Sequence, residues 1–316
     1  MSSSLAATEG QQCQQDKGVT LKSTWGDKFK KNKKKNQIRC MFQNINGFGY
    51  KEENSYKAEG IRTFITNNDI DVYAMQEMNT DWRRCKKSFT IWERTRGWFE
   101  NMKITVSNNL REKNSSPYQS GGTGILCQKD LSLQMIDSGK DPRRLGQWTW
   151  QLFKGKNNIC LRIISVYFAK PSDFGKRKAY FQQKEALQQS HIVEPPEEVF
   201  WIDLWKEVDQ WSQQGDQIVI GRDWNVDVTR EEFLELFMER GLYPAITGRH
   251  GNNAPNTCNR GSEPIDEIFV SANIVVTAAV YLECGEGEGN HRPLWFEMEK
   301  NSVLGTNVLD RPQYAA

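Results

Sequence analysis

Apolar runs of strand length recur along this chain, and each is attached to a small group of polar residues. Runs of about four to eight apolar residues bounded by turn residues are typical of buried strands. The runs lie at residues 38–47, 71–77, 161–168, 217–227, 264–271 and 289–298. The pattern therefore predicts a series of strands that carry polar side chains at their ends.

Three segments have apolar residues at helical spacing. Residues 56–67 separate the first two strands. Residues 197–214 follow a Pro-Pro pair that suits a helix start, and their tryptophan stripe is more typical of core packing than of base stacking. Residues 229–232 have the form of a capping box, with Gly241 as a stop signal. This order of elements predicts a mixed sheet system with helices outside.

The run at residues 217–227 delivers Asp223 and Asn225 two positions apart. Side chains two apart in a strand point the same way, so an anionic acceptor and an amide donor can meet one phosphate. This pairing suits hydrolysis of a phosphodiester. Asp and Asn are also common in turns that follow strands, so a plain turn is an equal alternative for this motif alone.

The other apolar runs carry similar polar residues. These residues are Asn44 and Asn46, Glu77, Tyr167, Asp266, and Asn290 followed by His291. Phosphodiester cleavage needs an activated water, neutralised charge on the phosphoryl oxygens and a leaving oxygen that is helped away. Glu77 is the best candidate ligand for Mg²⁺, which prefers a few carboxylate oxygens and keeps much of its water. A solvent-facing residue at a strand end is the alternative for Glu77.

In this order and spacing, these motifs resemble those of the endonuclease/exonuclease/phosphatase superfamily, which includes DNase I-like nucleases and apurinic repair endonucleases. The resemblance is closest to the endonuclease domains of non-LTR retrotransposons, and it covers residues 38–298. It implies a DNase I-like fold of the α+β class. That fold is a four-layered α/β/β/α sandwich of two packed sheets, with the active site at one sheet edge.

The resemblance also implies a metal site for Mg²⁺ or Mn²⁺. It maps Asn46 onto an asparagine that touches the metal and phosphate, and it places Glu77 and Asn290 among the metal ligands. Asn44 is a weaker, substrate-binding candidate.

The remaining motif residues take catalytic roles by the same resemblance. Asp223 would orient or deprotonate the water, Asn225 would hold the water or the phosphate, and Tyr167 would donate its hydroxyl to a phosphoryl oxygen. His291 would pair with Asp266, because a carboxylate fixes the imidazole tautomer and raises its basicity. A half-buried packing role is the alternative for Tyr167.

Two residues depart from the family pattern. Asn290 stands where the family usually has Asp, which removes one negative charge and lowers the expected metal affinity or activity by about 10–100-fold or more. Arg222 stands where a small residue or glycine is usual, and a cation close to Asp223 would lower the pKa of that carboxyl.

Because the motifs run from the first strand to the last, the 316-residue chain is expected to hold one domain over residues 37–299. Polar composition predicts disordered tails at residues 1–36 and 300–316. The formal net charge of +2 gives no global basic field.

Local positive charge is clustered ahead of the first strand, at Lys28, Lys30, Lys31, Lys33, Lys34 and Lys35. Such a run suits phosphate binding or nuclear import, and a solvated linker is an equal alternative. Arg260 lies in a Gly- and Asn-rich loop that could approach a nucleic-acid backbone.

The seven cysteines are scattered without a Cys-x-x-Cys pair, which argues against a disulfide framework or a zinc site. No stretch reaches the roughly 20 apolar residues of a membrane span. These features predict an intracellular protein, in the nucleus or the cytoplasm.

The leading hypothesis is a metal-dependent phosphodiester hydrolase, a retroelement-derived endonuclease that nicks DNA. One alternative is a catalytically impaired family member that binds nucleic acid or protein without cutting, which Asn290 favours. Another is a phosphatase or phosphodiesterase that acts on a small phosphoester.

Overall fold

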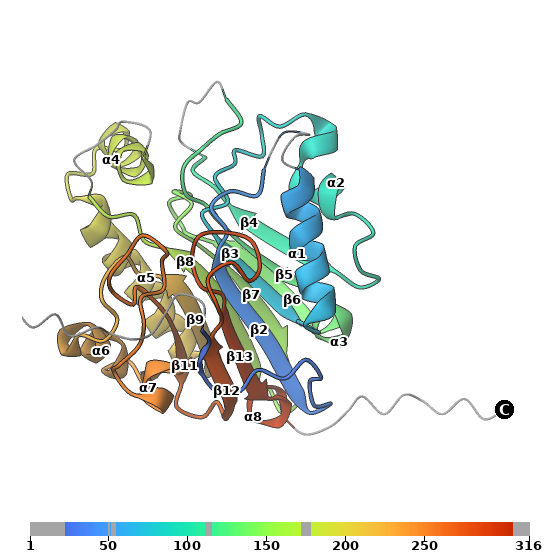
Figure 1. Ribbon diagram of the computed structural model, residues 1–316. Coiled ribbons are helices and arrows are strands. Elements are labelled where there is room, and N and C mark those ends of the chain that lie inside the picture. Colours follow the sequence, from blue (N-terminus) through green and yellow to red (C-terminus); the bar gives the residue numbers. More distant parts are fainter. Residues whose placement is uncertain (1–22, 50, 52–54, 111–115, 172–177, 306–316) are drawn as a thin grey trace, which may run out of the picture.

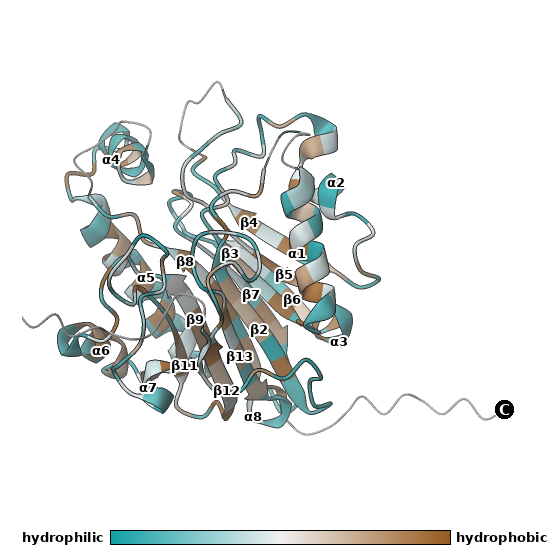
Figure 2. Cartoon of the chain, in the orientation of Figure 1, coloured by the Kyte–Doolittle hydropathy of each residue, from teal (hydrophilic) through white to brown (hydrophobic). Residues whose placement is uncertain are grey.

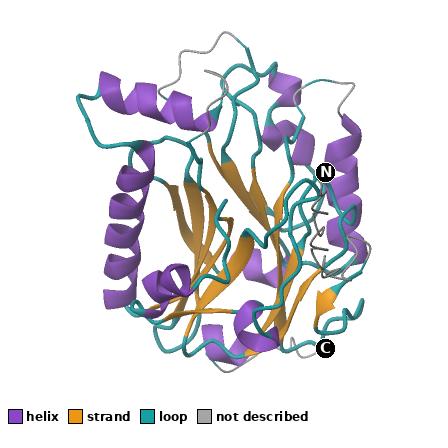
Figure 3. Cartoon of the chain, turned by 60° about the vertical axis from the view of Figure 1, so that its left-hand side comes forward, coloured by secondary structure: helices purple, strands orange, loops and turns teal. Residues whose placement is uncertain are grey.

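The computed structural model describes residues 23–49, 51, 55–110, 116–171 and 178–305. Two β-sheets pack face to face, and helices cover their outer faces (Figure 1). Figure 3 shows the helices outside the strands from a second direction. This is the expected four-layered α/β/β/α sandwich, and the expectation of a DNase I-like fold is confirmed.

The first sheet has seven strands in the described part of the chain. Their order is β1 (Trp25–Gly26), β12 (Val276–Tyr281), β13 (Leu294–Glu299), β2 (Gln37–Asn44), β3 (Val72–Gln76), β5 (Thr123–Cys127) and β4 (Lys103–Ser107). Only β2 and β3 run parallel within this described sheet, and both are buried along their whole length, as parallel strands are.

The second sheet has six strands over the described residues. Their order is β10 (Leu242–Pro244), β11 (Asp266–Ser271), β9 (Asp216–Asp223), β8 (Cys160–Tyr167), β7 (Trp148–Lys154) and β6 (Met135–Lys140). The pair β8 and β9 is parallel, so each sheet has one central parallel pair.

Helices fill the outer layers. The described helical segments are α1 (Ser55–Asn67), η2 (Lys87–Phe89), α2 (Ile91–Thr95), α3 (Lys129–Leu133), α4 (Ala179–Gln189), α5 (Pro196–Gln213), α6 (Glu231–Met238), α7 (Thr247–His250) and α8 (Lys300–Leu304). The three helices expected from apolar spacing are present as α1, α5 and α6. The sequence did not indicate α4, whose apolar positions are sparse.

Three apolar layers hold the sandwich together. The central layer lies between the sheets and includes Phe42, Ile163 and Phe296. A second layer lies under α1, and a third lies under α5 and α6. Figure 2 shows the apolar colouring concentrated on the strands. Trp201 and Trp205 of α5 pack on the rings of Trp224 and Phe237, which confirms core packing for the tryptophan stripe.

The sheets approach closely near one end because Gly221 of β9 faces the ring of Phe42 on β2. A Cβ atom at Gly221 would overlap that ring. This close approach brings the carboxyl ends of the two parallel pairs together.

The start of α6 differs from the expected capping box. Arg230 occupies the N-cap position and makes no side-chain cap bond. Thr229 is instead engaged by Asp227, whose Oδ1 accepts its backbone N–H at 3.0 Å and its hydroxyl at 2.7 Å. Gly241, with φ of +69°, ends the segment as expected.

The folded body begins before residue 37. Trp25 and Gly26 pair with β12, and Trp25 stacks on Tyr281 at 5.6 Å between ring centroids. The rest of the expected amino-terminal tail, residues 1–22, lies outside the described residues. At the other end α8 buries Val303 and Leu304, and residues 306–316 lie outside the description.

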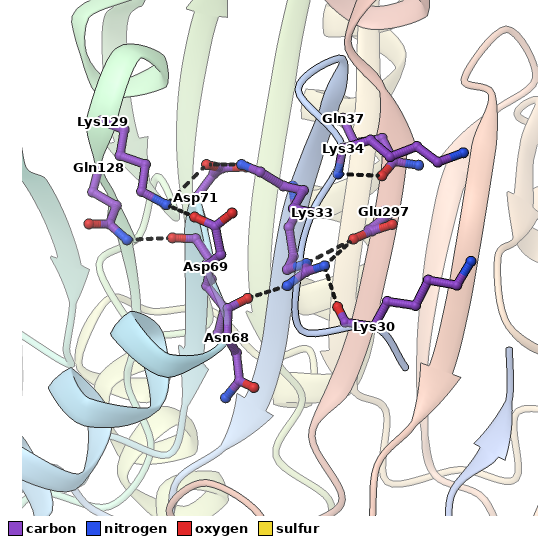
Figure 4. Close-up of polar contacts among 12 residues, drawn as sticks. Lys30, Lys33, Lys34, Gln37, Asn68, Asp69, Asp71, Gln128, Lys129 and Glu297 are labelled. Carbon is purple, nitrogen blue, oxygen red and sulfur yellow. Dashed lines mark hydrogen bonds and ion pairs between the residues drawn. The ribbon is translucent and has the colours of Figure 1, made fainter. Parts of the chain in front are cut away.

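The lysine segment is held against the body by β2. Arg39 of β2 is fully buried, and its guanidinium donates to the carbonyl oxygens of Lys30 at 2.7 Å and Lys31 at 2.8 Å. The same group pairs with Glu297 of β13 at 2.6 Å. Lys33 reaches the carboxylate of Asp71 (Figure 4). In residues 23–36 this segment is therefore part of the fold and not a solvated linker.

Candidate active site

The candidate site lies where strands of both sheets end. On the first sheet, Asn44 and Gln76 are register partners at the ends of β2 and β3. On the second, Asp223 ends β9 and has Tyr167 of β8 as one register partner and Asp266 of β11 as the other. Because parallel neighbours end at the same edge, each central pair brings its terminal polar residues to one place.

A buried chain of polar contacts joins the two sheets here. Asp266 Oδ2 is 2.8 Å from His291 Nδ1, and His291 Nε2 is 3.8 Å from Asp223 Oδ2. Asn44 donates from Nδ2 to the same Asp223 oxygen at 2.9 Å. All four side chains are buried, so water screens these charges weakly.

Burial and mutual charge set the protonation of this cluster. Loss of water raises the pKa of Asp223, the positive charge of His291 lowers it, and the charge of Asp266 raises it again. The net direction is upward. Burial alone would lower the pKa of His291, but the two flanking carboxylates raise it well above its ordinary value. His291 is therefore a cation held between two carboxyl groups.

Both sheets use the same turn to leave the site. Asn44 Oδ1 accepts the backbone N–H of Asn46 at 3.0 Å, and Asp223 Oδ1 accepts that of Asn225 at 3.1 Å. Asn46 and Asn225 are in the left-handed region, with φ of 46° and 50°. The strands end at Asn44 and Asp223, so strand alternation does not extend to Asn225 as the sequence suggested. Side chain-to-backbone turns orient these residues instead.

The ranking of the two asparagines is also changed. Asn44, the weaker candidate from sequence, is the buried residue that contacts Asp223 and lies 3.5 Å from His291 Nε2. Asn46 is exposed at the rim. Either asparagine fits the motif spacing. They differ because β2 ends at Asn44, which is buried, whereas Asn46 lies in the loop that follows.

Glu77 lies beside Asn46 on the adjacent strand end. The backbone N–H of Gly47 donates to the Glu77 carbonyl at 2.6 Å, so the two loops touch. Glu77 is half-buried with φ of 50°, and its negative charge contributes to raising the pKa of Asp223. Among the described residues, the side chains of Glu77 and Asn46 have no hydrogen-bond partner, so their oxygens remain available as ligands.

Asn290 directly precedes His291 in the chain and lies beside Cys258. Its Nδ2 lies 4.0 Å from Cys258 Sγ, and its Oδ1 is buried without a hydrogen-bond partner among the described residues. An unpaired buried acceptor costs about 1–3 kcal/mol, which a cation or its bound water would relieve. Amide and carboxylate oxygens, such as those of Asn290, Asn46 and Glu77, are of the kind that Mg²⁺ and Mn²⁺ prefer.

A second group of side chains has metal-like spacing. One ligand atom each of Asp223, Asp266 and His291 lies within 4.8 Å of the others. The Nδ1 of His291 bonds Asp266, so only Nε2 of a neutral ring could bind a metal here, because a protonated imidazole has no lone pair to offer.

The remaining predicted residues lie around this centre. Tyr167 is largely buried, and its ring lies against Gly121, with Ala179 and Tyr180 in the same apolar cluster. Asn225 donates one amide hydrogen to the Phe168 carbonyl at 2.8 Å, which leaves its second hydrogen for another acceptor.

The loop that carries Arg260 contacts the site through Cys258. Cys258 and His291 form an isolated antiparallel β-bridge. Arg260 itself is exposed at the outer side of that loop. The side chain of Arg222 lies outside the described part of the structure, so its expected effect on Asp223 stays a prediction.

The sequence gave no indication of Lys57 in α1. Its ammonium donates to the carbonyl oxygens of Ile45, Asn46 and Gly47 at 2.8, 2.9 and 3.0 Å. All three hydrogens of the ammonium are thus used to hold the loop that carries Asn46. A lysine in a helix has no local pattern that would reveal such a contact.

Comparisons with known proteins agree with this architecture. The model of the "Endonuclease/Exonuclease/phosphatase family" matches residues 41–288. A sequence comparison with curated proteins finds no match. Among the solved structures, the AP endonuclease LMAP from Leishmania major is similar with a TM-score of 0.60, 11% identity and coverage of 84% of this chain and 88% of that chain.

Two further solved structures are similar at comparable levels. The APE2 catalytic domain of Xenopus laevis has a TM-score of 0.57 and 14% identity, and the match covers 83% of this chain and 92% of that chain. The 3′ phosphatase NExo from Neisseria, solved with a product DNA hairpin, has a TM-score of 0.53, 16% identity and coverage of 83% and 99%. At these identities the similarity shows a shared fold.

Proposed function

Because the chain belongs to the endonuclease/exonuclease/phosphatase family, we propose that it is a metal-dependent phosphodiester hydrolase that nicks DNA. The observation that carries this proposal is the buried chain from Asp266 through His291 to Asp223, with Asn44 on the same carboxyl oxygen. Buried charges are costly unless they are paired, and their concentration at a strand-end site is typical of catalytic centres.

DNA is the favoured substrate because of the similar structures. One similar structure is that of an AP endonuclease, and the Neisseria 3′ phosphatase was solved with a product DNA hairpin. Within the described residues no helix has the length and apolar character needed to cross a membrane. Derivation from a retroelement is part of the proposal and rests on the motif resemblance alone.

The residues divide the work of hydrolysis. Asp223 accepts the proton of the attacking water as the new P–O bond forms and the bond to the leaving oxygen breaks. The imidazolium of His291 stabilises the negative charge that develops on the phosphoryl group, and Asp266 keeps that ring protonated and oriented. Asn44 fixes the Asp223 carboxylate by donating to it.

The rim residues bind and orient the phosphate. We infer that the second amide hydrogen of Asn225 and the hydroxyl of Tyr167 donate to phosphoryl oxygens, because Tyr167 and Asp223 are register partners at the end of the β8 and β9 pair and Asn225 follows two residues later. Glu77, Asn46 and the Asn290 carbonyl would hold Mg²⁺ or Mn²⁺. A bound divalent ion supplies positive charge that polarises the phosphoryl oxygens.

The test is nicking of supercoiled plasmid at fixed salt, with Mg²⁺, with Mn²⁺ and with chelator. We expect nicking that depends on metal and that falls by about 100-fold or more in Glu77→Ala and in His291→Ala. His191→Ala is the matched control, because His191 is exposed and lies outside every site motif. The proposal fails if the native chain and Asn290→Asp are both inert, or if chelator leaves nicking unchanged.

A catalytically impaired protein that binds without cutting is the second candidate, and the Asn290 side chain favours it. The unpaired buried oxygen of Asn290 is neutral where a carboxylate would carry charge. An inert native chain together with an active Asn290→Asp variant would establish this second candidate. If both cut, we expect Asn290→Asp to need about 10-fold less metal for half-maximal rate.

A further inference from the structure

Two tyrosine rings are exposed beside the candidate metal ligands. Tyr56, the second residue of α1, is 63% exposed, and Tyr118 is 41% exposed. Both line one pocket of about 290 Å³, and Asn46 lines the same pocket. Two exposed aromatic rings that line one pocket next to the candidate site can contact a ligand.

The pocket is polar in a specific way. Its other lining residues among those described are Gly47, Gly49, Lys57 and Asn79, and none of them is a carboxylate. Asn79 accepts the Gly121 N–H on its Oδ1 at 2.9 Å, which fixes the amide and leaves its NH₂ group as a donor. Asn46 offers both a donor and an acceptor. The two amides can hydrogen-bond the edge of a flat heterocycle, and the two rings can stack on its faces.

The walls of the pocket are built rigidly. Lys57 donates hydrogen bonds to the carbonyls of residues 45–47. These bonds connect the loop that carries Asn46 to the start of α1, where Tyr56 lies. Thr80 and Tyr118 form a β-bridge, which fixes the opposite wall next to Asn79. Figure 1 shows α1 lying against the sheet that contains β2 and β3.

We propose that this pocket receives a nucleobase of the substrate strand, stacked by Tyr56 and Tyr118 and contacted at its edge by Asn46 and Asn79. This subsite rests on the proposed function, because it lies beside the phosphate-cleaving centre. The volume is near the lower end of small-molecule pockets, which begin at about 300 Å³, so it suits one ring system and not a larger group.

The test measures base stacking directly. A single-stranded oligodeoxynucleotide that carries 2-aminopurine between thymines is titrated with the full chain in chelator, so that binding is read without cleavage. Stacking quenches 2-aminopurine emission. We expect strong quenching by the native chain, its loss in the Tyr56→Ala/Tyr118→Ala double variant, and binding that is weaker by about 5- to 100-fold.

Two matched variants separate stacking from other effects. Tyr56→Phe/Tyr118→Phe keeps both rings and should retain the quenching, whereas loss of quenching in this variant would overturn the stacking assignment. Tyr243→Ala removes a tyrosine of similar exposure, 42%, on β10, and should change nothing. Absence of quenching by the native chain, or equal quenching by the alanine double variant, would also overturn the inference.

This readout is independent of catalysis. If the plasmid assay shows no cleavage but the quenching follows the tyrosine rings, the nucleobase subsite stands while the hydrolase proposal fails. If cleavage occurs and the alanine double variant cuts oligonucleotides with an unchanged KM, the subsite is wrong and the hydrolase proposal stands.

Discussion

Asn44 shows how one amide can organise a charged cluster. Its Nδ2 donates to Asp223 and its Oδ1 accepts the backbone of Asn46, so one side chain links the carboxylate of the second sheet to the rim loop of the first. An aspartate in this place would put two carboxylates in contact and raise the pKa values of both.

Sequence reasoning found most residues of the buried polar cluster because their types are uncommon at strand ends in this combination. It placed Asp266 with His291, and the structure brings them to 2.8 Å. It could not rank Asn44 above Asn46, because the end of a strand depends on pairing with distant segments. Cys258 gave no signal, since a lone cysteine carries no positional pattern.

Glu207 of α5 gives a pH-dependent prediction away from the site. Trp148 Nε1 donates to its carboxyl at 2.7 Å. Burial raises the pKa of Glu207 to about 7, and the Trp148 bond opposes that shift. The folded value lies above the unfolded value of about 4.3, so the stability that its protonation contributes is full at low pH and is lost as pH rises through about 7.

We therefore expect Glu207→Gln to melt close to the native protein at pH 5 and above it at pH 8. The expected gain is about 1 kcal/mol because the group keeps some contact with water, equivalent to about 2–4 °C. Thermal melts across this range test it, with the exposed Glu235→Gln as control. A gain that is constant with pH would contradict the assignment.

At the scale of elements, α1 does more than cover a sheet. Its first turn supplies Lys57, which holds the loop after β2, while its buried face supplies Ile61 and Ile65 to the core. The helix thus connects core packing to the position of Asn46. A shift of about 1 Å in a catalytic group can cost about 100-fold in rate.

We predict that Lys57→Met lowers the cleavage rate by about 10-fold or more and raises the metal concentration for half-maximal rate. Three carbonyls lose their donor, and the loop that carries Asn46 loosens. Metal titrations of nicking, with the exposed Lys184→Met of α4 as control, measure both effects. A lower melting temperature with an unchanged metal dependence would show that Lys57 only stabilises the fold.

Helices and strands were predictable from sequence where the local spacing of apolar residues agrees with their burial in the fold. Buried strands such as β3 and β8 are mostly apolar, and α5 has an apolar face. The capping box at residues 229–232 failed because Asp227 engages Thr229 first. The capping-box pattern considers only residues 229–232, so it does not take account of Asp227, which lies two residues before Thr229.

At the scale of the molecule, the amino-terminal segment completes the first sheet. Its composition suggested disorder because lysines outnumber apolar residues. Two aromatic residues decide the outcome: Trp25 stacks on Tyr281, and Phe29 meets the edge of Trp295 at 5.1 Å. Arg39 then fixes the backbone between them and β2.

A chain that begins at residue 37, the boundary expected from sequence, should therefore be less stable. It loses two ring contacts and two acceptors of the buried Arg39, and we expect a melting temperature lower by about 5 °C or more. A chain that begins at residue 23 is the control and should melt like the full chain. Equal melting of all three would remove this segment from the folded domain.

The division of the site between two sheets has a consequence for the timing of any activity during synthesis. Asn44 lies on a strand formed early in the chain, whereas His291 is followed by β13, which inserts beside β2. During synthesis the centre therefore cannot assemble until β13 has left the ribosome and paired with β2.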